Sequence, residues 1–307
     1  MKSSFINRPS SQIRRIVRNG MPVYEKQYVT NDWDEDVGVV RYRASQEVAL
    51  IRQLEESNFF GGRLGVVQIA NANPEEAIIA THEIPGASLG EFILQKRISV
   101  NLLPWLLAGR WLRKMQMLPV TIEQNEVVSK RDPEGIVDYC NLRLRSLADY
   151  GYRWPNNDVL QAILKTIEGL RDYRESRDLR PVWVHADYSP GNLMWDGRTF
   201  TPIDFAMARA GGRLEDATYL IHRLEMAKIY RPWIKLPVVD CRRAILRGLG
   251  QSDAANSPQY KALMIKHLIC RLHTYVRRPA KNYKQAIHDY WVRGVIRRKL
   301  LKAVDSA

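Results

Sequence analysis

Cysteine is scarce in this 307-residue chain, which has only Cys140, Cys241 and Cys270. An odd, scattered set without C-x-x-C spacing predicts neither a disulfide framework nor a zinc site, and it favours a reducing compartment. Long apolar runs are also missing, because the longest, 102–108, contains a proline and is far short of the roughly 20 residues of a membrane span. The N-terminal residues lack the apolar run of a signal peptide. We therefore expect a cytoplasmic protein without a transmembrane segment.

Acidic residues are the second shortage. The 33 Asp and Glu residues face 47 Lys and Arg residues, which gives a net charge of +14. Such a surplus attracts polyanions, acidic substrates or anionic membrane surfaces, and it does not choose among them. The 45% of hydrophobic and 26% of charged residues are typical of a soluble globular protein and exclude a disordered chain or a collagen. The length predicts about two domains or lobes.

The first 85 residues have mainly strand character. Asn19-Gly20 favours a two-residue hairpin turn between strands at 12–18 and 23–29, because both residues tolerate positive φ. Apolar residues at helical spacing predict a helix at 44–56. Two further strands are expected at 64–70 and 77–83, separated by the turn-like residues 71–74.

The remainder of the chain has mainly helical character. The expected helices lie at 89–94, 103–118, 158–177, 214–230 and, as one helical region, 241–301. The pattern predicts an α+β, bilobal fold. Residues 1–85 would form a small β-rich N-lobe, and residues 86–307 a larger helical C-lobe.

A compact β-rich patch at 182–205 carries the residues suited to chemistry. His185-Ala186-Asp187 opens a loop that ends at Asn192, and a hairpin with the turn Asp196-Gly197 leads to Asp204. The hairpin returns the chain on itself and brings Asp204 beside Asn192. Carboxylate and amide oxygens beside phosphate suit Mg²⁺. Asp187 then stays available to orient a hydroxyl and accept its proton.

The segment HADYSPGN followed by IDF resembles the H-x-D-x-x-x-x-N … D motif of the aminoglycoside phosphotransferase and choline kinase family, which has a protein kinase-like fold. The resemblance implies that Asp187 is the catalytic base, that Asn192 and Asp204 are Mg²⁺ ligands, and that His185 holds the catalytic loop. The alternative for this segment is an ordinary loop with Asx turns. The resemblance extends over residues 5–225, and residues 226–307 match nothing in the family pattern.

The N-lobe contains further positions of the same pattern. The family places a lysine that binds nucleotide phosphate on a strand like the one holding Lys26, and Glu47 falls where the partner of that lysine belongs. Residues 82–89 resemble the hinge whose backbone groups bind adenine, which assigns Glu83 to the nucleotide site. The only candidate for a phosphate loop is 8–11, which has no glycine, so Ser10 and Ser11 are its expected phosphate contacts. Alternatively, Lys26 and Glu47 are merely solvated surface residues.

The implied activity is Mg²⁺-dependent transfer of the γ-phosphoryl group of ATP to a hydroxyl of a small-molecule or glycan acceptor. The missing glycine loop supports one alternative, a catalytically inactive kinase-like scaffold. Basic residues interleaved with Trp291 and several tyrosines near the C-terminus support another, a kinase of a lipid-linked glycan at the inner face of the membrane. A charge of +14 disfavours polycationic acceptors. No nucleic-acid motif accompanies the charge, so we expect no nucleic-acid partner.

Overall fold

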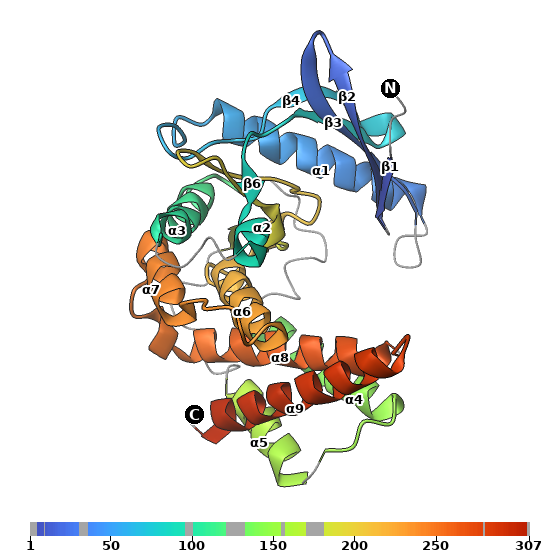
Figure 1. The fold of residues 1–307 in the computed structure, drawn as a ribbon, viewed down its shortest axis with the longest axis vertical. Helices are drawn as coiled ribbons and strands as arrows, with labels where there is room; N and C mark the ends of the chain where they lie inside the picture. Colours follow the sequence, from blue (N-terminus) through green and yellow to red (C-terminus); the bar gives the residue numbers. More distant parts are fainter. Residues whose placement is uncertain are drawn as a thin grey trace.

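The protein has two lobes, a β-rich one and a larger helical one (Figure 1). The structure is a computed structural model that describes residues 5–8, 10–30, 36–95, 101–120, 133–154, 157–169, 181–278 and 280–305. In Figure 1 the N-terminal sheet and its helix lie at one end of the molecule, and the long C-terminal helices lie at the other. The bilobal α+β architecture expected from the sequence is confirmed.

The N-lobe is built on one five-stranded antiparallel sheet with the strand order β1-β2-β3-β5-β4. Its strands are β1 (Phe5–Arg8), β2 (Ser11–Arg18), β3 (Met21–Tyr28), β4 (Ile69–Asn73) and β5 (Ile78–His82). Asn19 and Gly20 both have positive φ, 52° and 77°, and form the predicted turn between β2 and β3. This turn fixes the register in which Ile13 lies opposite Lys26.

One long helix, α1 (Val37–Glu56), packs against the sheet (Figure 1). Asp36 caps its N-terminus, because the Asp36 side chain accepts a hydrogen bond of 2.7 Å from the Gly38 N–H. The helix therefore begins seven residues before the predicted start at 44. Its buried face consists of apolar residues at helical spacing together with one charged residue, Glu47. That buried carboxylate is the feature that ties the sheet to the second lobe.

Short strands join the two lobes. β6 (Ala87–Ser88) pairs with β8 (Leu193–Trp195), which pairs with β9 (Phe200–Pro202). Since β5 belongs to the first sheet and β6 to the second, the chain passes between the lobes at residues 83–86. Gly86 has φ 98°, and a Cβ there would lie 2.4 Å from the Trp195 carbonyl oxygen. Only glycine fits this crossing. β7 (Val182–Val184) pairs with β10 (Arg209–Gly211).

The second lobe is helical. Its helices are α2 (Leu89–Leu94), α3 (Leu103–Met115), α4 (Pro133–Asp149), α5 (Asn157–Glu168), α6 (Glu215–Tyr230), α7 (Val238–Leu249), α8 (Pro258–Arg277) and α9 (Tyr283–Asp305). Short 3₁₀ turns lie at η1 (Pro74–Glu76), η3 (Pro190–Asn192) and η4 (Ala254–Asn256). α8 and α9 lie side by side, and α6 lies between them and the short strands (Figure 1).

Some sequence predictions were wrong. Residues 65–68 are not a strand, because the Gly65 N–H donates to the Phe200 carbonyl (2.9 Å) and Val67 is buried outside the sheet. The expected turn at 71–74 is largely strand β4, and the turn follows at η1. β1 and α4 were not predicted. The helix expected at 158–177 ends at Glu168, and residues 170–180 lie outside the described residues.

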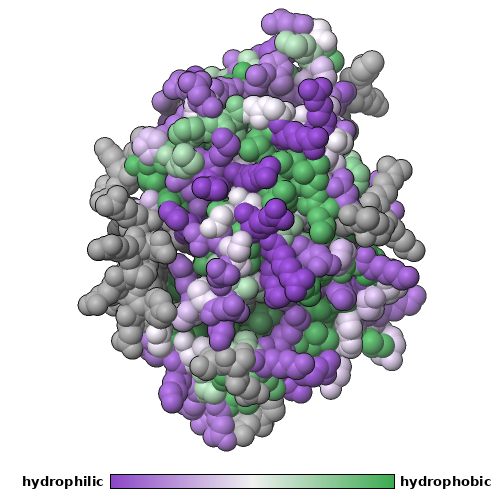
Figure 2. Space-filling model, turned by 90° about the vertical axis from the view of Figure 1, so that its left-hand side faces the viewer, coloured by the Kyte–Doolittle hydropathy of each residue, from purple (hydrophilic) through white to green (hydrophobic). Residues whose placement is uncertain are grey.

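No helix among the described residues is both long and apolar enough to cross a membrane. Figure 2 shows one face of the molecule, on which hydrophilic side chains cover most of the surface with smaller hydrophobic groups between them. The apolar residues instead form a core that runs through both lobes. Its largest fully buried side chains include Trp105, Trp111, Tyr188 and Phe205. The Trp111 ring packs against Tyr188, next to Asp187, and against Phe205, next to Asp204.

Candidate active site

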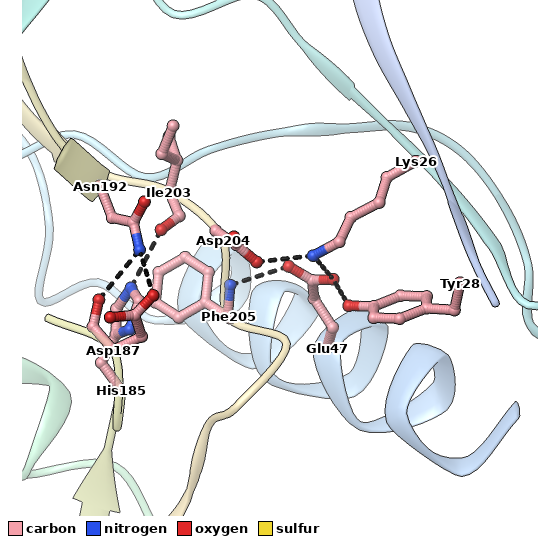
Figure 3. Close-up of polar contacts among 9 residues, drawn as sticks. All are labelled: Lys26, Tyr28, Glu47, His185, Asp187, Asn192, Ile203, Asp204 and Phe205. Carbon is pink, nitrogen blue, oxygen red and sulfur yellow. Dashed lines mark hydrogen bonds and ion pairs between the residues drawn. The ribbon is translucent and has the colours of Figure 1, made fainter. Parts of the chain in front are cut away.

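Lys26 on β3 reaches across to the second lobe. Its Nζ lies 2.6 Å from Asp204 Oδ1 and 3.4 Å from Glu47 Oε2 (Figure 3). Burial by itself lowers the pKa of Lys26, but the carboxylates of Glu47 and Asp204 outweigh it and raise the pKa above its usual value. Lys26 is therefore a fixed cation between the two lobes.

Glu47 connects three segments of the chain. Its Oε2 accepts hydrogen bonds from Lys26 and, at very short range, from the Tyr28 hydroxyl, whereas its Oε1 accepts from the Phe205 N–H at 2.8 Å (Figure 3). Burial and the nearby Glu47 carboxylate raise the pKa of Tyr28 well above its usual value, so the phenol stays a proton donor. Because Glu47 is only 3% exposed, these donors replace the water that a buried carboxylate loses.

Asp204 is held in a sparsely populated backbone conformation. It has φ 67°, in the left-handed region, without being glycine. The next residue, Phe205, is buried, and its ring packs 4.8 Å from the His185 ring and 5.7 Å from Trp111. Desolvation raises the pKa of Asp204, but the attraction of Lys26 is stronger, and the pKa lies below its usual value. Asp204 therefore presents an ionised carboxylate.

Asp216 and His185 hold the loop before Asp187. The buried Asp216 carboxylate accepts hydrogen bonds from the backbone N–H groups of His185 (2.7 Å) and Ala186 (2.9 Å). His185 Nε2 lies 3.0 Å from the Ile203 carbonyl oxygen, and since a carbonyl only accepts, Nε2 carries the proton. Burial raises the pKa of Asp216. His185 is fully buried, and its contact with Ile203 positions the residue directly before Asp204 (Figure 3).

Asp187 is oriented by two donors from different elements. Asn192 Nδ2 lies 3.0 Å from both the Asp187 carbonyl oxygen and Asp187 Oδ2, and the Tyr219 hydroxyl donates to Asp187 Oδ1 at 3.3 Å. Both partners of the Asn192 side chain only accept, which assigns its nitrogen to that side and leaves its oxygen for a cation. Sequence reasoning missed Tyr219, although its position three residues after Asp216 on one helix was a usable signal.

Asn192 and Asp204 are suited to a shared cation. The Ile203 N–H donates to the backbone carbonyl oxygen of Asn192 at 2.9 Å, which puts Asn192 beside the residue that precedes Asp204. Among the described residues no group of three or more His, Cys, Asp or Glu side chains could hold a metal. Mg²⁺ is commonly bound through one or two carboxylates together with substrate phosphates. The donor set therefore fits Mg²⁺ in company with a nucleotide.

The predicted phosphate loop differs from expectation. Ser11 lies within β2, opposite Tyr28, and is only 3% exposed, so it is part of the sheet and not of an open loop. The chain turns tightly here because Arg8 and Ser11 pair directly. Ser10 is half-buried in that turn, and its carbonyl oxygen accepts from the Val29 N–H at 3.1 Å.

Glu83 lies at the crossing between the lobes. Its carboxylate accepts hydrogen bonds from Arg15 Nη2 (2.6 Å) and the Tyr24 hydroxyl (3.3 Å), and Arg15 lowers the pKa of Glu83. Its backbone N–H already donates to the Pro22 carbonyl oxygen at 3.1 Å. Of the two backbone groups of Glu83, this leaves the carbonyl oxygen for contact with the adenine of a nucleotide. The structure thus brings Lys26, Glu47 and Asp204 together and keeps Glu83 outside that group.

Comparison with known proteins gives one family match and several solved structures that are similar over most of the chain. The model of the Phosphotransferase enzyme family matches residues 33–256. A search of curated proteins found no match. An amicoumacin kinase solved with AMP-PNP and Ca²⁺ is 14% identical, with 97% of this chain and 88% of that one covered and a TM-score of 0.60. APH(2″)-IIa, solved with streptomycin and ATP, is 12% identical, with 98% and 91% covered and a TM-score of 0.57.

An ethanolamine kinase from Plasmodium vivax is also similar. It is 11% identical, with 96% of this chain and 81% of that one covered, at a TM-score of 0.58. At these identities the solved structures show a shared fold. Their coverage also includes most of residues 226–307, which the sequence motifs left without a match.

Proposed function

The chain belongs to the phosphotransferase enzyme family, and on that basis we propose that it transfers the γ-phosphoryl group of ATP to a hydroxyl of a small-molecule or glycan acceptor. One observation carries the proposal. Lys26 from the sheet lies within hydrogen-bond distance of both Glu47 from α1 and Asp204 from the second lobe. Solved structures of the same fold hold ATP or AMP-PNP, which supports a nucleotide for this chain too.

Catalysis of phosphoryl transfer depends mainly on positioning and on charge neutralisation. The ammonium of Lys26 would bind phosphate oxygens. Asn192 and Asp204 would hold Mg²⁺, which neutralises charge on the phosphates when it is bound. Glu47 would keep Lys26 and the backbone of Phe205 in place. Ser10 and the carbonyl of Glu83 stay secondary candidates for contact with the nucleotide.

Asp187 would act on the acceptor. Its carboxylate orients the acceptor hydroxyl and takes the hydroxyl proton, the hydroxyl oxygen forms a bond to the γ-phosphorus, and the bond to the bridging β,γ-oxygen breaks to release ADP. The hydrogen bonds from Asn192 and Tyr219 to Asp187 fix this carboxylate from two sides and leave lone pairs for the acceptor.

The test is transfer of label from [γ-³²P]ATP to a panel of hydroxyl-bearing metabolites and glycans, with Mg²⁺ and with EDTA. We expect Mg²⁺-dependent label in an organic acceptor. Asn192→Ala should raise the Mg²⁺ concentration for half-maximal transfer about tenfold, since it removes one of two protein ligands. Absence of transfer to any acceptor supports the inactive scaffold and contradicts the proposal.

We also propose that the chain binds anionic membrane surfaces reversibly. Exposed apolar and aromatic side chains recur at helical spacing along the first half of α9, at Tyr283, Ile287, Tyr290 and Trp291. Exposed cations surround the start of this face, at Arg277, Arg278, Lys281 and Lys284. Aromatic side chains flanked by Lys and Arg favour the interface of an anionic bilayer, with about 1 kcal/mol for each cation near the surface.

Co-sedimentation with vesicles tests this surface. We expect binding to vesicles with phosphatidylserine, weaker binding at physiological than at low salt, and little binding to phosphatidylcholine alone. Lys281→Glu with Lys284→Glu should abolish binding, whereas the charge-matched control Lys228→Glu with Lys235→Glu should retain most of it. Equal binding to both vesicle types, or equal effects of the two double variants, contradicts this proposal and leaves the phosphotransfer proposal untouched.

A further inference from the structure

One face of α6 continues from the candidate catalytic loop to an arginine. Asp216, Tyr219 and Arg223 follow one another at spacings of three and four and so lie on one face of the helix. The first two contact the loop, Asp216 at its backbone and Tyr219 at the Asp187 carboxylate. The Arg223 guanidinium lies 6.0 Å from the centre of the Tyr219 ring. Arg223 is thus one helical turn, roughly 6 Å along the axis, beyond the residue that contacts Asp187.

A second arginine approaches the same rings from α8. His267 Nε2 lies 3.1 Å from Thr218 Oγ1, and the His267 ring lies 5.6 Å from the Tyr219 ring. Arg271 follows His267 by one helical turn and so lies on the same face of α8. The His222 ring of α6 stacks on the His267 ring, with the ring centres 5.5 Å apart. The charge of Arg271 reaches this cluster, since burial first, and then Arg271 and Arg223, lower the pKa of His222 to about 3. Two cations from two helices therefore face one ring cluster.

These two arginines differ from their neighbours in having no carboxylate partner among the described residues. Within the described ranges neither Arg223 nor Arg271 forms an ion pair with a carboxylate, although both are half-buried. Neighbouring cations are paired, as Lys299 is with Glu225 (2.6 Å) and Arg209 with Glu215 (2.7 Å). The adjacent carboxylate of Asp187 is held by Tyr219 and Asn192.

A pair of half-buried guanidinium groups without a carboxylate partner is well suited to an anion. Guanidinium groups match the planar, two-oxygen edge of carboxylates and phosphates. The same two positive charges repel an ammonium group that approaches Asp187 from this side. The positive charge near Asp187 therefore favours an acceptor with a negatively charged group over one with a positively charged group.

We propose that the acceptor carries a phosphate or carboxylate group, which Arg223 and Arg271 bind while the acceptor hydroxyl lies against Asp187. This inference rests on the proposed phosphotransfer and names its substrate class. Because Arg223 stands about one helical turn beyond Tyr219, the residue that contacts Asp187, an anionic group at Arg223 and a hydroxyl at Asp187 are only a few bonds apart. A phosphorylated or acidic sugar has this spacing.

The test uses a metabolite and glycan extract of the cells that make the protein, separated by ion exchange into anionic, neutral and cationic pools. Each pool is incubated with the enzyme, Mg²⁺ and [γ-³²P]ATP. We expect label to be transferred to an acceptor of the anionic pool. Arg223→Gln and Arg271→Gln should each raise KM for that acceptor about tenfold or more, with KM for ATP unchanged.

Lys228→Gln is the matched control, because it removes one positive charge from an exposed position of the same helix. Its KM for the acceptor should stay at the wild-type value. Transfer to the neutral or cationic pool, or arginine variants that behave like Lys228→Gln, would overturn the inference while phosphotransfer stands. Transfer to no pool would instead contradict the proposed phosphotransfer itself.

Discussion

Glu47 illustrates how single residues hold the site together. One buried carboxylate accepts hydrogen bonds from Lys26, from the Tyr28 hydroxyl and from the Phe205 N–H. If Lys26 turns toward a phosphate, Tyr28 and Phe205 still solvate Glu47. The carboxylate is then never left buried without donors, which would cost several kcal/mol. The fold therefore tolerates the loss of Lys26 better than the loss of Glu47.

Replacing Lys26 tests this division of roles. We expect Lys26→Met to lower kcat/KM for ATP about 10²-fold to 10³-fold, the usual cost of one missing electrostatic contact to the reacting group. The melting temperature should change little. Steady-state kinetics and thermal unfolding measure the two effects, with the exposed Lys235→Met as the control. An unchanged kcat/KM would remove Lys26 from the nucleotide site.

His222 makes stability depend on pH. Burial and the nearby arginines lower its pKa to about 3, whereas in the unfolded chain it titrates near 6.5. Between pH 6.5 and pH 3, His222 is protonated in the unfolded state but not in the folded state. The free energy of unfolding therefore has its full value above pH 6.5 and falls as the pH drops toward 3. From pH 7.5 to 5.0 the loss from this one residue is about 2 kcal/mol.

The variant His222→Leu should lose less stability over that interval. We expect its free energy of unfolding, measured in urea at pH 7.5 and 5.0, to fall by about 2 kcal/mol less than that of the wild type. His288→Leu serves as the control, since His288 is only half-buried. Equal losses in wild type and His222→Leu would show that His222 titrates normally.

Among the elements, α3 and α7 cross unusually closely under the candidate catalytic loop. A Cβ at Gly109 would lie 2.0 Å from the Ile245 carbonyl oxygen, and one at Gly248 would lie 2.1 Å from the Leu106 carbonyl oxygen. The backbones of the two helices therefore touch. The residue before Gly109, Ala108, accepts a hydrogen bond of 3.0 Å from the Tyr188 hydroxyl next to Asp187. The crossing thus supports the loop directly.

Gly109→Ala should separate these helices. We expect a loss of about 3 kcal/mol or more in the free energy of unfolding, because the added methyl group meets backbone atoms that cannot rotate away. Gly294→Ala in α9 is the control, since nothing lies within 4 Å of its added Cβ. That change should stabilise the protein by about 0.5–1 kcal/mol. A Gly109→Ala protein as stable as the wild type would contradict the close crossing.

Elements with a local signal were predictable from the sequence. The Asn19-Gly20 turn is encoded by two residues that adopt positive φ, and it is present as predicted. The hairpin around Asp196-Gly197 is present too, but only Gly197 has positive φ, and four residues, 196–199, connect β8 and β9 in place of the predicted two. The run 64–68 was misjudged because its apolar residues are buried against β9 and not in the sheet. A contact between segments so distant in sequence leaves no trace in periodicity.

The motif residues of the candidate site were predictable from the sequence, whereas several of their hydrogen-bond partners were not. The motif indicated Asp187, Asn192 and Asp204, and the structure has Asn192 in contact with Asp187 and Lys26 in contact with Asp204. Tyr28 and Tyr219 were missed as hydrogen-bond partners, since each comes from an element whose placement depends on tertiary packing. Ser11 was misjudged because a tight hairpin has the same polar residues as an open loop.

The molecule as a whole builds its site from both lobes. β3 and α1 supply Lys26 and Glu47, and the segments next to the short strands β7, β8 and β9 supply Asp187, Asn192 and Asp204. The surplus of 47 basic over 33 acidic residues creates a positive field that attracts nucleotides, anionic acceptors and anionic surfaces alike. Such attraction weakens with salt, whereas the paired contacts within the site are buried and depend on it less.

The rate of phosphoryl transfer by Asp187→Asn tests the central claim most directly. The account predicts a fall in kcat of about 10²-fold to 10⁴-fold, because the variant cannot accept the acceptor proton, with KM for ATP and thermal stability near the wild-type values. The exposed Asp253→Asn, which removes the same charge elsewhere, should keep the wild-type rate. A kcat for Asp187→Asn close to that of the wild type and of Asp253→Asn would contradict the assignment of Asp187 as the base.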